Sequence, residues 1–265
     1  MRDLKIAIIG CGNIGSSIAN GLIADKDFKA SNLTLTKRNL TSLESLKKAG
    51  VNLTSDNIEA VKNSNIIIIG VKPYMVKEVI SEIREHIDNK KHTIISLATG
   101  FTTDALHDNL KTDVPIYRVM PNIAAEINES MTCVCHKFAN EEQNNEVEWI
   151  LNKIGKTLFI KEDLMEAATV LGACGIAYAL RFIRGMIQGG IQIGFDAKTA
   201  NAIVNQTVKG AAELLIKNGK HPEVEIDKVT TPKGYTIIGL NEMEHQGFSS
   251  SLIKGILASY NKIEK

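Results

Sequence analysis

The sequence predicts an α/β protein, in which an N-terminal Rossmann-like, doubly wound domain is followed by an all-α dimerisation domain. Over residues 1–160, short apolar runs alternate with amphipathic helical patterns, which is the order of right-handed βαβ units. A glycine-rich turn at residues 10–15 directly follows the first apolar run. From Asp163 onward the pattern is helical, and no convincing strand is found.

The length of the chain favours two domains. At roughly 150 residues per domain, 265 residues correspond to about two. We place a Rossmann-like domain at residues 1–161 and an all-helical domain at residues 162–265, with the boundary within residues 160–163. With 44% hydrophobic and 23% charged residues, the chain can bury a sizeable core.

Charge and cysteine usage exclude several classes of protein. The formal net charge of +1 argues against a nucleic-acid binder or a polybasic membrane-surface protein. Four cysteines in a chain of this length do not resemble a secreted disulfide framework. The longest aliphatic run, residues 66–69, is far shorter than the roughly 20 residues of a membrane helix, and the N-terminus has no signal-peptide core. We therefore expect a soluble, cytoplasmic protein with no nucleic-acid or membrane partner.

Seven β-rich runs of the first domain are expected to be strands. Several are unbroken apolar runs, as in strands of a parallel sheet that is covered on both faces. The seven runs are residues 5–9, 33–36, 66–69, 93–97, 116–119, 132–135 and 157–160.

Helical faces lie between these runs and throughout the second domain. A stripe of Ile14, Ile18 and Leu22 predicts a helix directly after the glycine turn, and residues 76–83 form another such face. In the second domain, Asp196 is well placed to cap a helix with a clean apolar face. The members of that face are Ala200, Ile203, Val204, Val208, Ala211 and Leu215. Residues 176–193 are apolar nearly all round, so we expect that helix to be buried centrally or between subunits.

The glycine turn is the strongest functional signal. It reads G-x-G-x-x-G and consists of Gly10, Cys11, Gly12, Asn13, Ile14 and Gly15. The first glycine permits a tight turn, the second lets backbone approach a pyrophosphate, and the third lets helix and strand pack closely. Phosphate then binds the free N–H groups of the helix N-terminus. The motif predicts a dinucleotide-binding site.

The residues after the second strand indicate which dinucleotide is bound. An acid at this position would bind the 2′-hydroxyl of NAD, but the chain has Lys37 and Arg38 there, about 20 residues beyond the glycines. Two cations suit a 2′-phosphate, so NADP(H) is favoured, with NAD(H) as the alternative cofactor. Lys37 and Arg38 are also open to interpretation as solvated loop charges.

Three further loops follow the carboxyl ends of strands, where ligands bind in open α/β sheets. They are residues 70–73, 98–100 and 118–122, and we expect them to line the cofactor crevice. With these loops and the C-terminal part in view, the chain resembles the pyrroline-5-carboxylate reductase family over nearly its whole length. The matching stretches are the glycine turn, the V-K-P loop, R-V-M-P-N, residues 206–212, residues 231–236 and 237–240, Glu244 and residues 247–248.

The resemblance implies reduction of the cyclic imine 1-pyrroline-5-carboxylate to L-proline with NAD(P)H, the last step of proline biosynthesis. It also implies a helical domain that interlocks with a second subunit, in a dimer or a decamer built of dimers. The implied cofactor contacts are Gly10, Cys11, Gly12, Asn13, Ile14, Gly15, Asn57, Gly70, Val71, Lys72, Pro73, Leu97, Ala98 and Thr99. The implied substrate contacts are Cys174, Thr231, Lys233, Gly234 and Tyr235, with Thr236 as the hydroxyl nearest the imine.

Two stretches depart from the family pattern. The family reads S-G-S-G-P-A-Y where this chain has G-A-C-G-I-A-Y at residues 172–178. In the family's S-P-G-G-T-T loop, this chain carries bulk at Lys233 and Tyr235. These departures concern the substrate side of the site and leave the cofactor motifs unchanged.

Hydride delivery to a C=N carbon needs positioning and a polarised nitrogen more than a strong base. A helix N-terminus after residues 231–235 offers N–H groups to a carboxylate, and the Thr236 hydroxyl can bind the imine nitrogen. The alternative interpretation is that Thr236 is an ordinary N-cap of that helix.

The sequence also allows two functions other than imine reduction to be considered. The altered residues 172–176 suit a cofactor-binding paralogue that has lost turnover. A β-hydroxyacid-dehydrogenase-like enzyme would share the domain plan, but the position of its lysine, four residues after Gly175, holds Ala179. Cys133, Cys135 and His136 lack a second ligand pair, so no metal site is expected. Cys11 is interpreted as a small filler whose pKa the adjacent helix N-terminus would lower.

Overall fold

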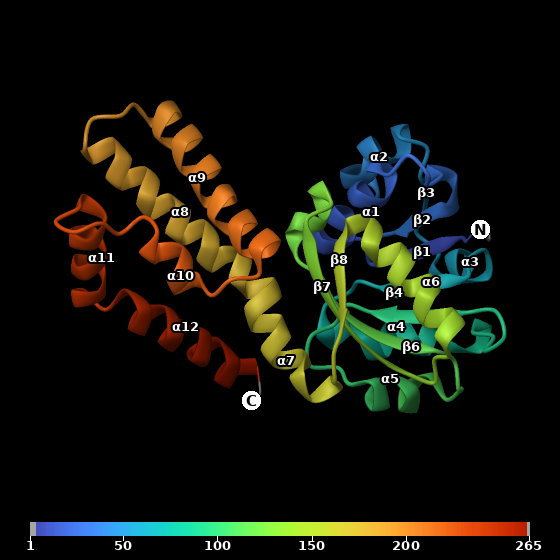
Figure 1. Cartoon of the computed structure of the whole chain (residues 1–265). Coiled ribbons are helices and arrows are strands. Elements are labelled where there is room, and N and C mark those ends of the chain that lie inside the picture. Colours follow the sequence, from blue (N-terminus) through green and yellow to red (C-terminus); the bar gives the residue numbers. More distant parts are fainter. Residues whose placement is uncertain (1–3, 264–265) are drawn as a thin grey trace. The chain divides into compact units, whose positions relative to one another are not determined.

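The computed structural model describes residues 4–263. It divides into two compact units (Figure 1). The first contains the chain up to Cys174 together with Ile263, and the second is Gly175–Lys262. The division thus falls after residues 162–174, which stay with the first unit, whereas the sequence places the boundary at residues 161/162.

The first unit is built on one eight-stranded sheet with the strand order β3-β2-β1-β4-β5-β6-β7-β8. The strands are β1 (Ile6–Ile9), β2 (Leu33–Thr36), β3 (Asn52–Thr54), β4 (Ile66–Ile69), β5 (Thr93–Ser96), β6 (Ile116–Met120), β7 (Ser130–Lys137) and β8 (Gly155–Phe159). All neighbouring pairs are parallel except β6 and β7. The seven expected strands are confirmed, and the sheet is mixed rather than wholly parallel.

Two features of the sheet were not predicted. Strand β3 has three residues and lies at the sheet edge, so its N-L-T sequence carries too short a pattern to detect. Strand β7 runs antiparallel because only a short 3₁₀ segment, Ile123–Ile127, connects it to β6. A parallel connection needs a crossover of a dozen or more residues.

Helices cover both faces of the sheet (Figure 1). They are α1 (Asn13–Ala24), α2 (Glu44–Lys48), α3 (Asn57–Lys62), α4 (Val76–Ile83), α5 (Thr103–Leu110), α6 (Glu141–Leu151) and, after the sheet, α7 (Met165–Ala168). Alternate residues of β1 enter separate cores, because successive strand side chains point to opposite faces. Ile6 and Ile8 pack with α1 and α6, whereas Ala7 and Ile9 pack with α3, α4 and α5.

The second unit is helical throughout its described residues. Its helices are α8 (Gly175–Gln192), α9 (Ala197–Asn218), α10 (Pro222–Asp227), α11 (Tyr235–His245) and α12 (Phe248–Ile263). Asp196 caps α9 as predicted, and its Oδ1 accepts the N–H groups of Lys198 and Thr199, both at 3.0 Å. Of the predicted apolar face of α9, Ala200 and Val204 are buried.

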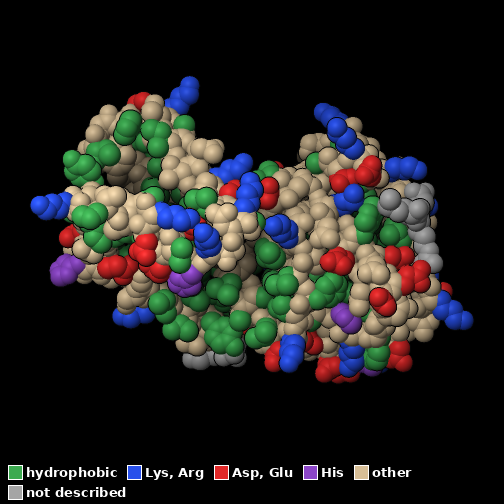
Figure 2. Space-filling model, in the orientation of Figure 1, with side chains coloured by type: hydrophobic (Ala, Val, Ile, Leu, Met, Phe, Trp, Pro, Cys, Tyr) green, Lys and Arg blue, Asp and Glu red, His purple; other side chains and the backbone are tan. Residues whose placement is uncertain are grey.

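Much apolar surface of the second unit lies open in the single chain, and apolar side chains are visible there (Figure 2). No residue of α8 is buried among those the structure describes. The helical segment Glu162–Gln192 is long and apolar enough to cross a membrane by length and composition alone. Polar and charged residues interrupt this segment, so it contains no long unbroken aliphatic run. One such helix is weak evidence for a membrane, because a helix that packs against another protein has the same composition.

Candidate cofactor and substrate sites

The surroundings of each glycine in the turn explain why glycine is found at that position. Gly10 has a φ of +78°, and a Cβ there would lie 2.2 Å from Val71 Cγ1. A Cβ at Gly15 would lie 3.2 Å from Ile8 Cγ2, so this glycine lets α1 approach β1. At Gly12 the nearest atom to such a Cβ is 4.0 Å away, which leaves space beside the backbone. The three roles expected of the motif therefore agree with the geometry.

In the glycine turn, the backbone N–H groups that are available to a ligand start at Asn13. The N–H of Cys11 donates to Thr36 O at 2.9 Å and that of Gly12 to Gly10 O at 2.7 Å, so both are already used. Asn13, Ile14 and Gly15 form the first turn of α1, where N–H groups have no acceptor within the helix. This end of α1 suits an anion such as a pyrophosphate.

The side chain of Cys11 does not take part in this anion site. It is fully buried, and burial raises the pKa of its thiol despite a contact with Ser16 Oγ at 3.5 Å. The expectation that the helix N-terminus would lower this pKa is wrong, because burial has the larger effect. Cys11 acts here as the small filler that the sequence suggested.

The strand register brings the other expected cofactor loops beside the turn. Ile9 pairs with Thr36 on one side and with Ile69 on the other, so three carboxyl ends lie together. Gly70 N donates to Ile9 O at 2.8 Å, and Leu97 N donates to Ile69 O at 3.0 Å. Residues 70–73 and 97–99 therefore lie at the same edge of the sheet as the glycine turn.

The end of β2 carries the two predicted cations. Lys37 Nζ donates to Ser42 Oγ at 2.7 Å, and Arg38 is exposed, with no side-chain partner in the described part of the chain. Asn57, the first residue of α3, lies beside this strand end, where its Oδ1 accepts from the Thr36 hydroxyl at 2.6 Å. Cationic and amide groups thus surround the place where a Rossmann domain holds the adenosine ribose.

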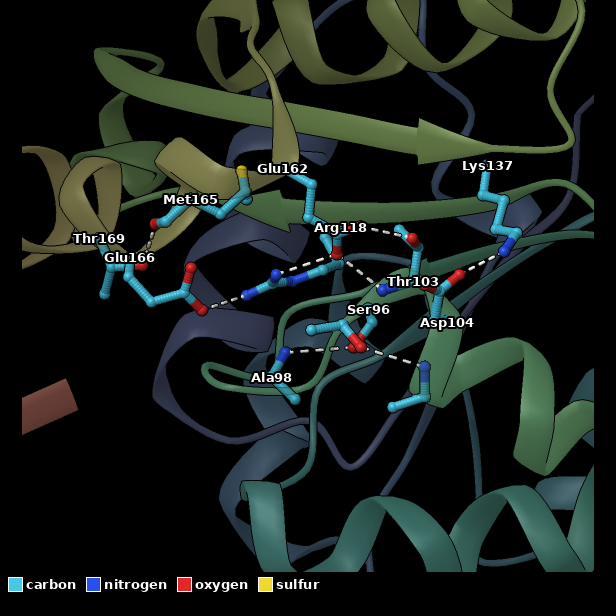
Figure 3. A network of polar contacts seen from close by, with 12 residues as sticks. Ser96, Ala98, Thr103, Asp104, Arg118, Lys137, Glu162, Met165, Glu166 and Thr169 are labelled. Atoms are coloured by element: carbon cyan, nitrogen blue, oxygen red, sulfur yellow. Dashed lines mark hydrogen bonds and ion pairs between the residues drawn. The ribbon is translucent and has the colours of Figure 1, made fainter. Parts of the chain in front are cut away.

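Arg118 has a different place from the one expected. We expected residues 118–122 to line the crevice, but Arg118 lies within β6, and its side chain is 2% exposed. Its guanidinium pairs with Glu162 Oε1 at 3.0 Å and with Glu166 Oε1 at 2.9 Å (Figure 3). Sequence reasoning missed this role because both partners lie more than 40 residues away.

Glu162 joins this network to helix α5. Its carboxylate accepts the N–H of Thr103 at 2.7 Å and the hydroxyl of Thr103 at 2.6 Å (Figure 3). Burial would raise the pKa of Glu162, but hydrogen bonds from Thr103 and Arg118 hold it below its ordinary value. The network thereby ties residues 162–166 to the sheet.

The expected substrate loop forms a tight turn before α11. Gly234 N donates to Thr231 O at 2.9 Å, Lys233 has a φ of +58°, and a Cβ at Gly234 would lie 2.5 Å from Thr231 Oγ1. Tyr235 is 95% exposed. The N-cap is Gly234, so the alternative interpretation of Thr236 as an N-cap is wrong. Thr236 is exposed, and its hydroxyl has no partner within residues 4–263.

The stretch that departs from the family pattern, residues 172–178, overlaps a π-helical turn, Thr169–Cys174. Asn122 Nδ2 donates to Gly172 O at 3.1 Å, so the loop after β6 supports this turn. Cys174 is half-buried and ends the first unit. Short π-helical segments are frequent at functional sites.

Cys133 and Cys135 share one face of β7 and pack with Met120 and Met165. Burial raises the pKa of Cys135 to about 12. Among residues 4–263, no group of three or more His, Cys, Asp or Glu side chains is arranged to hold a metal ion.

Comparison with known proteins identifies the family. Residues 162–265 match the model described as pyrroline-5-carboxylate reductase dimerisation, and residues 5–100 match that of NADP oxidoreductase, coenzyme F420-dependent. Pyrroline-5-carboxylate reductase 2 of Dictyostelium discoideum is 43% identical, over 99% of this chain and 94% of that protein. The chain belongs to the pyrroline-5-carboxylate reductase family.

Two further pyrroline-5-carboxylate reductase relatives agree with this assignment. Pyrroline-5-carboxylate reductase 1 of D. discoideum is also 43% identical over 99% of this chain, which spans half the length of that relative. The crystal structure of Plasmodium falciparum pyrroline carboxylate reductase with NADP bound has a TM-score of 0.90 at 27% identity. That likeness covers 99% of this chain and 98% of the other. The fold is therefore that of a Rossmann-like domain followed by a helical dimerisation domain.

Proposed function

We propose that this chain is an NADPH-dependent pyrroline-5-carboxylate reductase, which transfers hydride to 1-pyrroline-5-carboxylate and forms L-proline in proline biosynthesis. Membership of the family supports the reaction. The observation that carries the cofactor assignment is the glycine turn with unused amides at Asn13, Ile14 and Gly15. The relative from P. falciparum binds NADP on the same fold.

NADPH is the preferred cofactor in this proposal. The end of β2 presents Lys37 and the exposed Arg38, with no acid directly after the strand to repel a 2′-phosphate. Arginine binds phosphate with charge-assisted and often bidentate hydrogen bonds. Residues 70–73 and 97–99, at the neighbouring strand ends, hold the remainder of the cofactor. The reduced nicotinamide supplies the hydride when it is bound.

The loop of residues 231–236 binds the substrate in this proposal. The N-terminus of α11 offers free N–H groups to the substrate carboxylate, because Gly234 provides no side-chain cap. The Thr236 hydroxyl donates to the imine nitrogen and raises the electrophilicity of the neighbouring carbon. Lys233 and Tyr235 lie within the same loop and limit the size of the ring that fits. Cys174 belongs to the substrate side through the family resemblance.

The chain forms a homodimer through its dimerisation domain. The open apolar faces of α8 and α12 are the surfaces that such contact would cover. We further propose that the dimers assemble into a decamer and that the protein is cytoplasmic.

Steady-state oxidation of NADPH with pyrroline-5-carboxylate tests the reaction directly. We expect turnover by the purified full chain, together with formation of L-proline in an amount equal to the NADPH consumed. Tight NADPH binding without turnover would instead support the altered paralogue, for which the changed residues 172–176 are the specific observation. Failure to bind either dinucleotide would contradict the cofactor site.

A further inference from the structure

A chain of hydrogen bonds connects the glycine turn to an acid on α4. Gly10 N–H donates to Thr36 Oγ1 at 3.2 Å, and Thr36 Oγ1 donates to Asn57 Oδ1 at 2.6 Å. Asn57 Nδ2 then donates to Glu82 Oε2 at 2.8 Å. The chain crosses from the end of β1 through β2 and α3 to α4. Its last member, Glu82, lies outside the glycine turn and the other sequence motifs described above.

The groups at the two ends of this series of hydrogen bonds, the Gly10 N–H and the Glu82 carboxylate, determine the direction of every hydrogen bond in it. A backbone N–H only donates, and an ionised carboxylate only accepts. Because Gly10 supplies a hydrogen to Thr36, the Thr36 hydroxyl has its own hydrogen left for Asn57. Because Glu82 requires a donor, Asn57 turns its nitrogen towards α4 and its oxygen towards Thr36.

We infer that Glu82 is a positioning residue for the dinucleotide site, and that it acts by fixing the orientation of the Asn57 amide. An asparagine amide can turn by half a rotation and exchange its oxygen and nitrogen. With Glu82 in place, the second N–H of Asn57 stays available to a ligand at the end of β2. The inference rests on the proposed cofactor site, in which Asn57 contacts the dinucleotide.

Burial of the hydrogen-bonded groups explains why the orientation of the Asn57 amide affects the glycine turn. Thr36 is 1% exposed, so water cannot easily replace Asn57 as the acceptor for its hydroxyl, whereas Asn57 is half-buried. Gly10 has a positive φ and lies against Val71, and the Thr36 hydroxyl is the partner of its N–H. Glu82 is exposed, so its substitution leaves the apolar core unchanged.

The substitution Glu82→Gln tests this inference, since glutamine keeps the shape but can donate as well as accept. We expect the dissociation constant for NADPH, measured by fluorescence titration, to rise about 3- to 10-fold. The KM for NADPH should rise by a similar factor, whereas kcat and the KM for the imine stay within twofold. The melting temperature without cofactor should not change, which separates positioning from a structural role.

Glu78→Gln is the matched control. Glu78 lies one turn earlier on α4, is exposed, and its carboxylate accepts no hydrogen bond from the residues between 4 and 263. This variant loses the same charge and should bind NADPH like the wild type. In an Asn57→Ala background, Glu82→Gln should have no further effect, because the group it orients is gone.

Two results would overturn the inference: unchanged NADPH affinity in Glu82→Gln, or equal weakening in Glu78→Gln. These results are independent of imine turnover, because the titration needs no substrate. A wild-type chain that binds NADPH but does not reduce the imine would contradict the proposed reaction and leave this test valid.

Discussion

The two units of the chain differ in how they bury their apolar side chains. In the first unit, alternate residues of β1 enter two separate cores and are at most 1% exposed. In the second, Leu180, Ile253 and Leu257 remain 53%, 57% and 53% exposed. A sheet covered by helices on both faces completes its own core, whereas no described residue covers the exposed apolar side chains of these helices. The first unit is therefore a self-contained scaffold, whereas the second depends on a partner surface.

The largest expected effect comes from a charge on the open apolar surface of the second unit. Leu180→Asp loses the burial of a leucine, worth about 1.5–3 kcal/mol, in each subunit of the dimer. With two copies, we expect about 4 kcal/mol and a dimer dissociation constant roughly a thousandfold higher. Light scattering over a range of concentrations measures this.

A control in the first unit sharpens that result. Ile127 is 70% exposed, so Ile127→Asp introduces the same charge at an open apolar position outside the second unit. It should leave the dimer intact. Equal dissociation by both variants would contradict the difference between the units.

Removal of Arg118 should destabilise the first unit through its interior. Arg118→Met leaves Glu162 and Glu166 without their cation, at a cost of about 3 kcal/mol in the free energy of unfolding. The value is near the low end for buried pairs, because both carboxylates keep some exposure. Denaturant unfolding measures the loss, and replacing both glutamates by glutamine as well should recover most of it.

The second unit offers a matched ion pair on its surface. Lys217 pairs with Glu213 at 3.0 Å, and both side chains are exposed. Lys217→Met should cost less than about 0.5 kcal/mol, as is typical of such helical pairs. A loss as large as that of Arg118→Met would show that burial is not the cause.

Thr236→Ala should affect catalysis and leave stability nearly unchanged. Loss of a hydrogen bond to a charged group, about 1.5–3 kcal/mol, lowers kcat/KM about 10- to 100-fold. Because Gly234 is the N-cap, we expect no loss of a helix cap. Steady-state kinetics and thermal unfolding on the same preparations measure both quantities. Thr236→Ser keeps the hydroxyl and should stay close to the wild type, whereas a normal kcat/KM in the alanine variant would end the catalytic assignment.

Arg38→Asp should change the choice of cofactor in the first unit. An acid at this position repels a 2′-phosphate and accepts from a 2′-hydroxyl. We expect the NADPH/NADH ratio of kcat/KM to fall about tenfold, equal to roughly 1.4 kcal/mol. A wild-type preference for NADH, or an unchanged ratio in the variant, would contradict the assignment of Arg38.

The smallest expected effect is a pH dependence confined to the first unit. The pKa of Glu162 is lower in the folded state than its ordinary value of 4.5. Its stabilising contribution is therefore fully present above pH 4.5 and is lost as the pH falls through the folded value. The difference in unfolding free energy between wild type and Glu162→Gln should shrink in that window. With Thr103→Val, which removes one donor, the loss should be smaller and should be complete at a pH closer to 4.5.

Local patterns were sufficient to predict several parts of the fold. The apolar runs predicted seven strands, and Asp196 predicted the start of α9. The G-x-G-x-x-G motif predicted a turn in which Gly10 and Gly15 are explained by neighbouring atoms that leave little room for a side chain. In each case the deciding interactions lie within a few residues of one another or follow from the strand–helix order.

Other features depend on residues far apart in the chain. Arg118 was expected to line the cofactor crevice, yet its side chain is buried and pairs with Glu162 and Glu166, whose positions no local pattern specifies. Glu82 has the pattern of a solvated helix charge, and only the packing of α4 beside α3 brings it to Asn57. The sequence alone left Thr236 open to an N-cap role, until the turn placed Gly234 at that position.

The order of elements, the dinucleotide turn and the apolar character of the second unit are predictable from the sequence, because periodicity and glycine chemistry are local properties. The antiparallel β7, the buried pairs of Arg118 and the hydrogen-bond chain to Glu82 became evident only in the folded protein. The physical reason is that burial and hydrogen-bond partners depend on which distant segments meet. A charged residue looks the same in the sequence whether water solvates it or an oppositely charged side chain pairs with it.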